Sequence, residues 1–189
     1  MLATNTSNGT TTAYAVASDF CLIFAQNMNS LYVLSFLLTA DRERAEQCFV
    51  GGLGDSVKAN QVFREWARSW ARRMIIQSAI RMIQPKPERA GMPALPAEPG
   101  RGTAKSENHA SIAGVVALPA FERFVFVMSV LERFSDQDCS ILLGCSRQDV
   151  ALARTQAAEH IASLAESSVP GAQGASGAFS QERWLAQSA

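Results

Sequence analysis

The chain has 189 residues, of which 48% are hydrophobic, and its 17 Lys and Arg residues balance 17 Asp and Glu residues. This length suffices for one domain or for two small ones, each with a modest hydrophobic core. Zero net charge argues against a general nucleic-acid binder, whose surface usually carries a clear excess of basic side chains. Any basic surface must therefore be local.

The first segment, residues 1–17, is rich in Thr, Asn and Ser and contains no Lys or Arg. It lacks the basic start of a signal peptide, so we predict a disordered N-terminus. The next segment, 20–40, carries no charge and approaches the ~20 residues that a membrane-spanning helix needs. Four polar side chains at its centre would be costly inside a bilayer. Its apolar residues recur at helical spacing, which predicts one buried helix instead of a membrane span. They are Phe20, Phe24, Leu31, Leu34 and Leu38.

The following helix is predicted from its two ends. Asp41 has the residue type and position of an N-cap, and Gly51–Gly52 are typical of a helix end, which predicts a helix over Arg42–Val50. With its neighbours, this helix belongs to a first helical domain over residues 18–84.

The longest predicted helix begins at Asp55 or Ser56 and ends near Gln84. One face carries large apolar residues at intervals of three and four, which favours burial in the core over stacking on nucleic-acid bases. These residues are Phe63, Trp66, Trp70 and Met74. Another face carries arginines four residues apart, with two more elsewhere on the helix. It is either a solvated surface or a contact for nucleic acid. These arginines are Arg64, Arg68 and Arg72, joined by Arg73 and Arg81.

Residues 85–113 are rich in Pro and Gly and have no apolar period, so they predict a flexible linker. A second helical domain is expected over residues 114–166. Residues 167–189 are mostly Ser, Gly and Ala and predict a flexible tail. Trp184 and Leu185 in this tail favour either a short partner-binding helix or a tail that folds back on its own domain.

Two capping boxes organise the second domain. Ser135 with Asp138 predicts a helix that begins at Asp136. Ser146 with Asp149 predicts a second helix that begins at Arg147. Gly144 lies between them, where a left-handed residue would end the first helix. This spacing is typical of a helix-turn-helix. The predicted fold class is therefore all-α, with two small helical domains joined by a flexible linker, the second a helix-turn-helix.

The second helix of that motif presents a limited set of candidates for DNA contact. Arg147 and Gln148 stand at its N-terminal end, where arginine can pair with guanine and glutamine with adenine in the major groove. The other candidates on its outer face are Ala151, Arg154 and Thr155. Between residues 119 and 166 seven acidic residues stand against four basic ones. Because phosphate neutralisation supplies most non-specific affinity, we expect this domain to bind DNA weakly by itself.

These segments resemble a known family. The second domain is similar to the C-terminal promoter-binding region of sigma factors of the sigma-70 family, extracytoplasmic-function type. The matching residues are Leu118-Pro119, Glu122-Arg123, the run 125–128, Leu131-Glu132, Phe134-Ser135 and the run 142–146. Residues 31–38, Asp41 and Ala45-Glu46 resemble the polymerase-binding region of the same factors, and Phe63, Trp66, Ala71 and Arg72 resemble the helix that contacts the promoter's melting element.

The resemblance implies a function and a set of contacts. It implies a cytoplasmic protein that binds core RNA polymerase and promoter DNA to direct transcription initiation, with an anti-sigma factor as a further candidate partner. Polymerase contacts would fall on Ala45, Glu46, Gln47, Phe49 and Val50, and further DNA contacts on Arg64, Arg68, Arg72 and Arg73. The alternative is a degenerate sigma-fold protein that serves as a protein-interaction or regulatory module without promoter recognition.

The residues do not predict an enzyme, a metal site or a cofactor. The four cysteines are scattered, which favours buried reduced thiols. Cys139 and Cys145 lack the close pairing with other Cys or His residues that zinc needs, and the only histidines are His109 and His160. No paired carboxylates, glycine-rich phosphate loop or nucleophile-base set can be assembled from the sequence.

Overall fold

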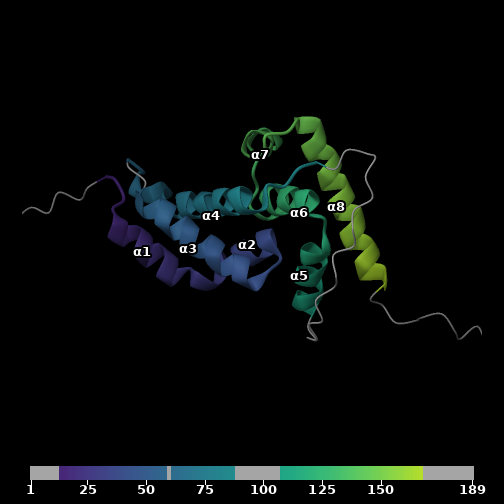
Figure 1. Ribbon diagram of the computed structural model, residues 1–189, viewed down its shortest axis with the longest axis horizontal. Coiled ribbons are helices and arrows are strands. Elements are labelled where there is room, and N and C mark those ends of the chain that lie inside the picture. Colours follow the sequence, from purple (N-terminus) through teal and green to yellow (C-terminus); the bar gives the residue numbers. More distant parts are fainter. Residues whose placement is uncertain (1–12, 59–60, 88–106, 168–189) are drawn as a thin grey trace, which may run out of the picture.

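The structure is a computed structural model that describes residues 13–58, 61–87 and 107–167 (Figure 1). Every element in these ranges is helical, which confirms the all-α prediction. The first half, residues 13–87, contains α1 (Ala17–Gln26), α2 (Met28–Thr39), α3 (Arg42–Lys58), the short 3-10 helix η1 (Arg64–Trp66) and α4 (Ala67–Ile83). The second half, residues 107–167, contains α5 (Glu107–Ala117), α6 (Ala120–Phe126), the π-helical turn η2 (Val127–Leu131), α7 (Asp136–Leu143) and α8 (Arg147–Ser167).

The uncharged segment 20–40 forms two helices, so the prediction of one helix is wrong. Asn27 interrupts the segment and donates from its side-chain amide to the carbonyl of Ile23 at 2.8 Å. This bond satisfies a carbonyl at the end of α1, and α2 leaves at an angle of 82°. The predicted apolar stripe is nevertheless buried in both helices, from Phe20 to Leu38.

Helices α1 and α2 contain the uncharged segment whose length approaches that of a membrane-spanning helix. No single helix in the described part of the chain is long and apolar enough to cross a membrane. Together α1 and α2 have the necessary length and composition, but the bend separates them.

Helix α3 runs through Gly51–Gly52, so the predicted helix end at these glycines is wrong, as is the predicted helix start near Asp55. Asp41 does cap α3, accepting the amide of Arg44 at 2.8 Å. The glycines are needed where α3 crosses α4. A Cβ on Gly52 would lie 2.7 Å from Ile75 Cδ1 and 3.1 Å from Ile75 Cα. Because glycine has no side chain, the two helices can approach closely at this crossing.

Part of the predicted disordered N-terminus is ordered. Residues 1–12 lie outside the described residues, but Tyr14 forms an isolated antiparallel bridge with Phe63. The amide of Ala15 donates to the carbonyl of Val62 at 2.7 Å, and the amide of Arg64 donates to the carbonyl of Ala13 at 3.0 Å. These bonds hold residues 13–15 against the segment that precedes α4.

The second half begins earlier than its sequence predicts. Residues 107–113 belong to α5, although the sequence places them in the linker, because Ile112, Val115 and Val116 supply an apolar face that packs into the core. The predicted linker residues 88–106 and the tail after Ser167 lie outside the described residues. The predicted helix starts at Asp136 and Arg147 are confirmed.

The two halves share one hydrophobic core. Leu34, Leu38 and Ile75 of the first half belong to the same buried cluster as Phe124 and Met128 of the second half. The tether predicted from the sequence would let two domains stand apart, whereas here α2 packs against α5, α6 and η2. Figure 1 shows the first half on the left and α8 slanting along the right-hand side of the second half.

A buried arginine forms hydrogen bonds to backbone carbonyls of both halves. Arg123 of α6 is only 7% exposed and donates to the carbonyls of Leu118 at 2.8 Å and of Val116 and Leu38 at 3.3 Å. These carbonyls lie at the ends of α5 and α2, where intrahelical partners run out. Burial lowers the pKa of the Arg123 guanidinium. The side chain therefore stabilises two helix ends from different halves.

Candidate nucleic-acid interface

Helices α7 and α8 are positioned by the two predicted capping boxes. The hydroxyl of Ser135 accepts the amide of Asp138 at 3.1 Å and donates to its carboxylate at 2.5 Å. Ser146 accepts the amide of Asp149 at 3.1 Å, and the Asp149 carboxylate accepts the amide of Ser146 at 3.0 Å. Between the helices Gly144 has a φ of 65°, the left-handed conformation predicted from the sequence. Local sequence thus determines this helix pair.

The packing between these helices uses small and branched residues. Ser140 of α7 is buried, and its hydroxyl donates to the carbonyl of Gln137 at 2.8 Å. On α8 Val150 and Ala157 are fully buried, and Ile161 packs against the hydrophobic core. The opposite face of α8 is left available to solvent.

Arg147 and Gln148, the residues predicted to read bases, are both exposed in the first turn of α8. Their position at a helix N-terminus also suits a polyanion, because the helix dipole favours negative charge there. Ala151 is half-buried, and exposed Thr155 donates its hydroxyl to the Ala151 carbonyl at 3.2 Å. The face of α8 that the sequence predicts to contact DNA therefore consists chiefly of its first turn.

Arg154, the fourth predicted contact on α8, is engaged within the protein. Its guanidinium binds both carboxylate oxygens of Asp136, at 2.5 and 3.2 Å. This pair ties the middle of α8 to the start of α7. The pair uses two of the five N–H donors of the guanidinium and offsets its charge, which weakens its attraction for phosphate.

The predicted arginine face of the first half is also partly neutralised. Arg64 pairs with Asp19 at 3.1 Å, and Arg72 forms a bidentate pair with Glu132 across the two halves. The Glu132 bond raises the pKa of Arg72. Arg68 is exposed and Arg73 is half-buried. Because α4 begins only at Ala67, Arg64 lies on η1 and does not continue the helical row that the sequence predicts.

An aromatic surface lies at the start of α4. The sequence predicts a buried stripe from Phe63 to Met74, and Met74 is indeed buried, but Trp66 is 60% exposed and Phe63 is exposed too. Tyr14 stacks on Phe63 with ring centroids 4.9 Å apart, and Phe63 meets Trp66 edge-on at 5.4 Å. Sequence reasoning missed this cluster because Tyr14 lies in the segment predicted to be disordered.

The residues predicted to bind polymerase lie on α3, on two of its faces. Ala45 is completely buried, so it supports the core and cannot contact a partner directly. Phe49 is half-buried and meets Phe24 edge-on, with ring centroids 5.2 Å apart. The remaining three residues form the exposed side of the helix. They are Glu46, Gln47 and Val50.

The cysteines divide between buried and accessible positions. Cys48 and Cys139 are fully buried, and burial, assisted by Asp136 and Asp138, raises the pKa of Cys139 to about 11. Cys21 is exposed. Within residues 13–58, 61–87 and 107–167, no three His, Cys, Asp or Glu side chains gather to form a metal-binding group.

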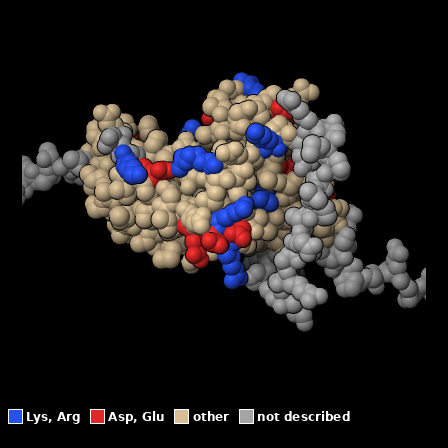
Figure 2. Space-filling view, in the orientation of Figure 1, with Lys and Arg blue, Asp and Glu red and all other residues tan. Residues whose placement is uncertain are grey.

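The charged surface is mixed. Figure 2 shows Lys and Arg side chains in separate patches, several of them beside Asp or Glu, instead of one continuous basic band. The ion pairs of Arg64, Arg72 and Arg154 account for part of this pattern. On the face that Figure 2 shows, these separate patches offer few neighbouring cations to a phosphate backbone.

No protein-family model matches the chain, and no curated protein matches it either.

Proposed function

We propose that the chain is a sigma factor-like protein that acts in the cytoplasm, binding core RNA polymerase and promoter DNA to direct transcription initiation. The observation that carries the proposal is the pair α7 and α8, joined through left-handed Gly144, with Arg147 and Gln148 exposed at the capped start of α8. A helix start of this kind can enter the major groove and reach base edges.

In this proposal α8 reads sequence and polymerase supplies most of the affinity. With Arg154 paired to Asp136, the α7–α8 unit offers few cations to phosphate, so its own DNA binding is weak and depends only slightly on salt. The exposed side of α3, with Glu46, Gln47 and Val50, is the polymerase contact. The protein itself carries out no reaction and needs no cofactor.

A second candidate function is a sigma-fold module that binds proteins but does not recognise promoters. The pairs Arg72–Glu132 and Arg154–Asp136 favour this candidate, because each occupies an arginine that the first proposal would use on DNA. The packing of the two halves favours it as well, since widely spaced promoter elements require separated contacts.

A transcription experiment separates the two functions. Promoters would first be selected from a random DNA pool by the full chain with core polymerase, and run-off transcription would then be measured. We expect Arg147→Ala to lower promoter binding by about 1–3 kcal/mol, roughly 5- to 150-fold, because it removes a bidentate base contact. Lys86→Ala, which removes an exposed positive charge after the end of α4, is the control and should leave DNA selection unchanged.

The outcomes distinguish the candidates. Polymerase binding without any promoter-dependent product would reject the first function and support the second. Failure to bind polymerase at all would reject the first function and would limit the second to protein partners other than polymerase.

A further inference from the structure

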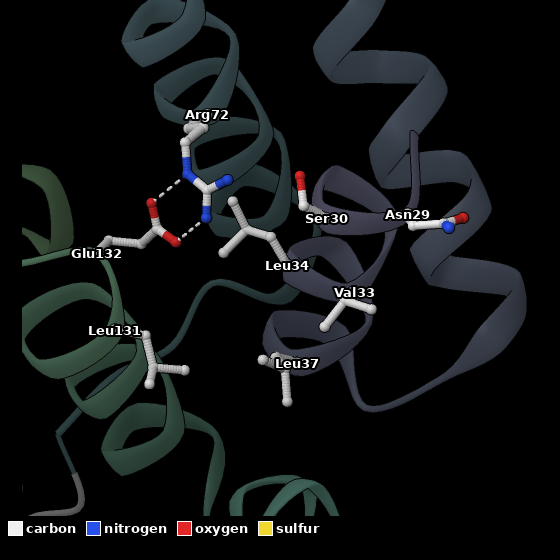
Figure 3. Close-up of a pocket in the computed structure, with 8 residues that line it drawn as sticks. All are labelled: Asn29, Ser30, Val33, Leu34, Leu37, Arg72, Leu131 and Glu132. Atoms are coloured by element: carbon white, nitrogen blue, oxygen red, sulfur yellow. Dashed lines mark hydrogen bonds and ion pairs between the residues drawn. The ribbon is translucent and has the colours of Figure 1, made fainter. Parts of the chain in front are cut away.

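A groove opens where the two halves meet. Helices α2 and α4 and the turn η2 enclose a hollow of about 410 Å³ (Figure 3). Buried Leu34 and Leu37 form part of its wall, while Val33 and Leu131 are 41% and 46% exposed at its edge. Figure 3 shows Leu131 pointing across the groove toward Leu37. The groove is therefore an apolar surface that solvent reaches.

One rim of the groove carries hydrogen-bond acceptors. The Arg72–Glu132 pair lies at this rim, and Glu132 retains lone pairs beyond those that accept from the guanidinium. Ser30 donates its hydroxyl to the carbonyl of Asn27 at 3.1 Å, so the oxygen of Ser30 is left as an acceptor. An apolar wall beside acceptors suits a tryptophan, whose large ring is apolar and whose only polar atom donates.

The chain itself supplies such a side chain. It continues for 22 residues beyond Ser167, the last residue of α8. Most of these residues are Ser, Gly and Ala, but Trp184 and Leu185 stand next to each other near the end. This pair is the largest apolar feature of the tail.

The tail is long enough to reach the groove. Residues 168–183 separate Ser167 from Trp184, and at ~3.3 Å per residue this segment spans up to about 50 Å. Arg154 lies about 20 Å back along α8 from Ser167 at 1.5 Å per residue, and it contacts Asp136. Asp136 is only four residues from Glu132 at the rim. The path from Ser167 to the rim is thus shorter than the extended length of the segment.

We propose that Trp184 and Leu185 of the same chain occupy this groove, with the indole N–H of Trp184 donating to an acceptor at the rim. Attachment to the same chain through residues 168–183 raises the effective concentration of the pair at the groove, so modest apolar burial suffices. The docked tail contacts α2 and η2 together and covers the Arg72–Glu132 pair, which stabilises the packing of the two halves. This proposal does not depend on the transcriptional function.

The test is fluorine NMR of the full chain labelled with 5-fluorotryptophan. The chain contains three tryptophans, so Trp184 is assigned by Trp184→Phe, while Trp66 and Trp70 report on the fold. We expect the Trp184 resonance to show little shift between H₂O and D₂O, and to move to the position of exposed fluorotryptophan in Leu131→Asp. Leu22→Asp, at an exposed position on α1, is the control and should leave the Trp184 resonance unchanged.

Each other outcome decides against the proposal. A Trp184 resonance at the exposed position in the wild-type chain overturns it, and so does a resonance that Leu131→Asp does not move. A resonance that shifts with protein concentration shows docking on a second copy and also overturns it. If Leu131→Asp disturbs the Trp70 resonance, Val33→Asp and Leu185→Asp replace it, with the same expected result.

Discussion

The crossing of α3 and α4 predicts opposite effects for the same substitution at two glycines of one helix. A Cβ on Gly54 meets nothing within 4 Å, whereas a Cβ on Gly52 lies 3.1 Å from the backbone Cα of Ile75, which is fully buried. Replacing glycine by alanine inside a helix stabilises it by about 0.8–1 kcal/mol. Gly54→Ala should therefore raise the free energy of unfolding by nearly that amount.

At Gly52 the steric cost exceeds the gain. Overpacking a core costs about 1–3 kcal/mol, and the nearest backbone atom cannot rotate away. After the helix gain is subtracted, Gly52→Ala should lower the free energy of unfolding by up to about 2 kcal/mol. The free energy of unfolding of Gly51→Ala should lie between those of the other two variants. Its Cβ would lie 2.6 Å from the hydroxyl oxygen of Ser78, and this side chain can relieve the contact by adopting another rotamer.

Urea denaturation followed by far-UV circular dichroism measures these differences through the transition midpoints. The denaturant slopes should agree among the variants, since the same surface is exposed on unfolding. A Gly52→Ala midpoint equal to or above that of Gly54→Ala would refute the close crossing of α3 and α4.

Three further predictions concern charge and protonation. Glu132→Gln should lower the free energy of unfolding by about 1 kcal/mol, because Arg72 is partly exposed and water replaces part of the lost interaction; an unchanged urea midpoint would contradict this. Cys21 should react with a thiol reagent at pH 8 far sooner than Cys139, whose raised pKa, about 11, and burial keep it a protonated thiol; mass spectrometry of the modified peptides gives the order, and equal rates would count against it. The Val16 amide lowers the pKa of Asp19 from its ordinary value of 3.8, so the stabilisation of α1 by Asp19 is complete above that value and is lost as pH falls through the lower folded one. An NMR titration of the Asp19 carboxyl tests this, and a midpoint at or above 3.8 would disprove it.

The helix pair α7 and α8 illustrates how much of the candidate site sequence could predict. Ser135 with Asp138 and Ser146 with Asp149 are three residues apart, so each capping box forms within one helical turn. The outward position of Arg147 and Gln148 follows from the helical period once the cap is known. Such features depend on neighbouring residues alone.

The ion pairs formed by the arginines that were predicted to contact DNA could not be predicted in this way. Arg72 and Glu132 are 60 residues apart, and Arg154 and Asp136 are 18 apart. Nothing in the local pattern of arginines shows that a carboxylate from another helix will be placed against them. The aromatic cluster at Phe63 could not be predicted for the same reason, because Tyr14 is far from Phe63 in sequence and contacts it only in the folded protein.

The sequence by itself determined the all-α class, the caps, the turn at Gly144 and the apolar stripe of α1 and α2. These follow from conformational preference and hydrophobic period, which act over a few residues. Tertiary structure alone decided that Gly51–Gly52 form a helix crossing and not a helix end. It also decided that the two halves share a hydrophobic core and that Arg123 forms a hydrogen bond between them. A glycine permits both a helix end and a close approach, and only the neighbouring helix selects between them.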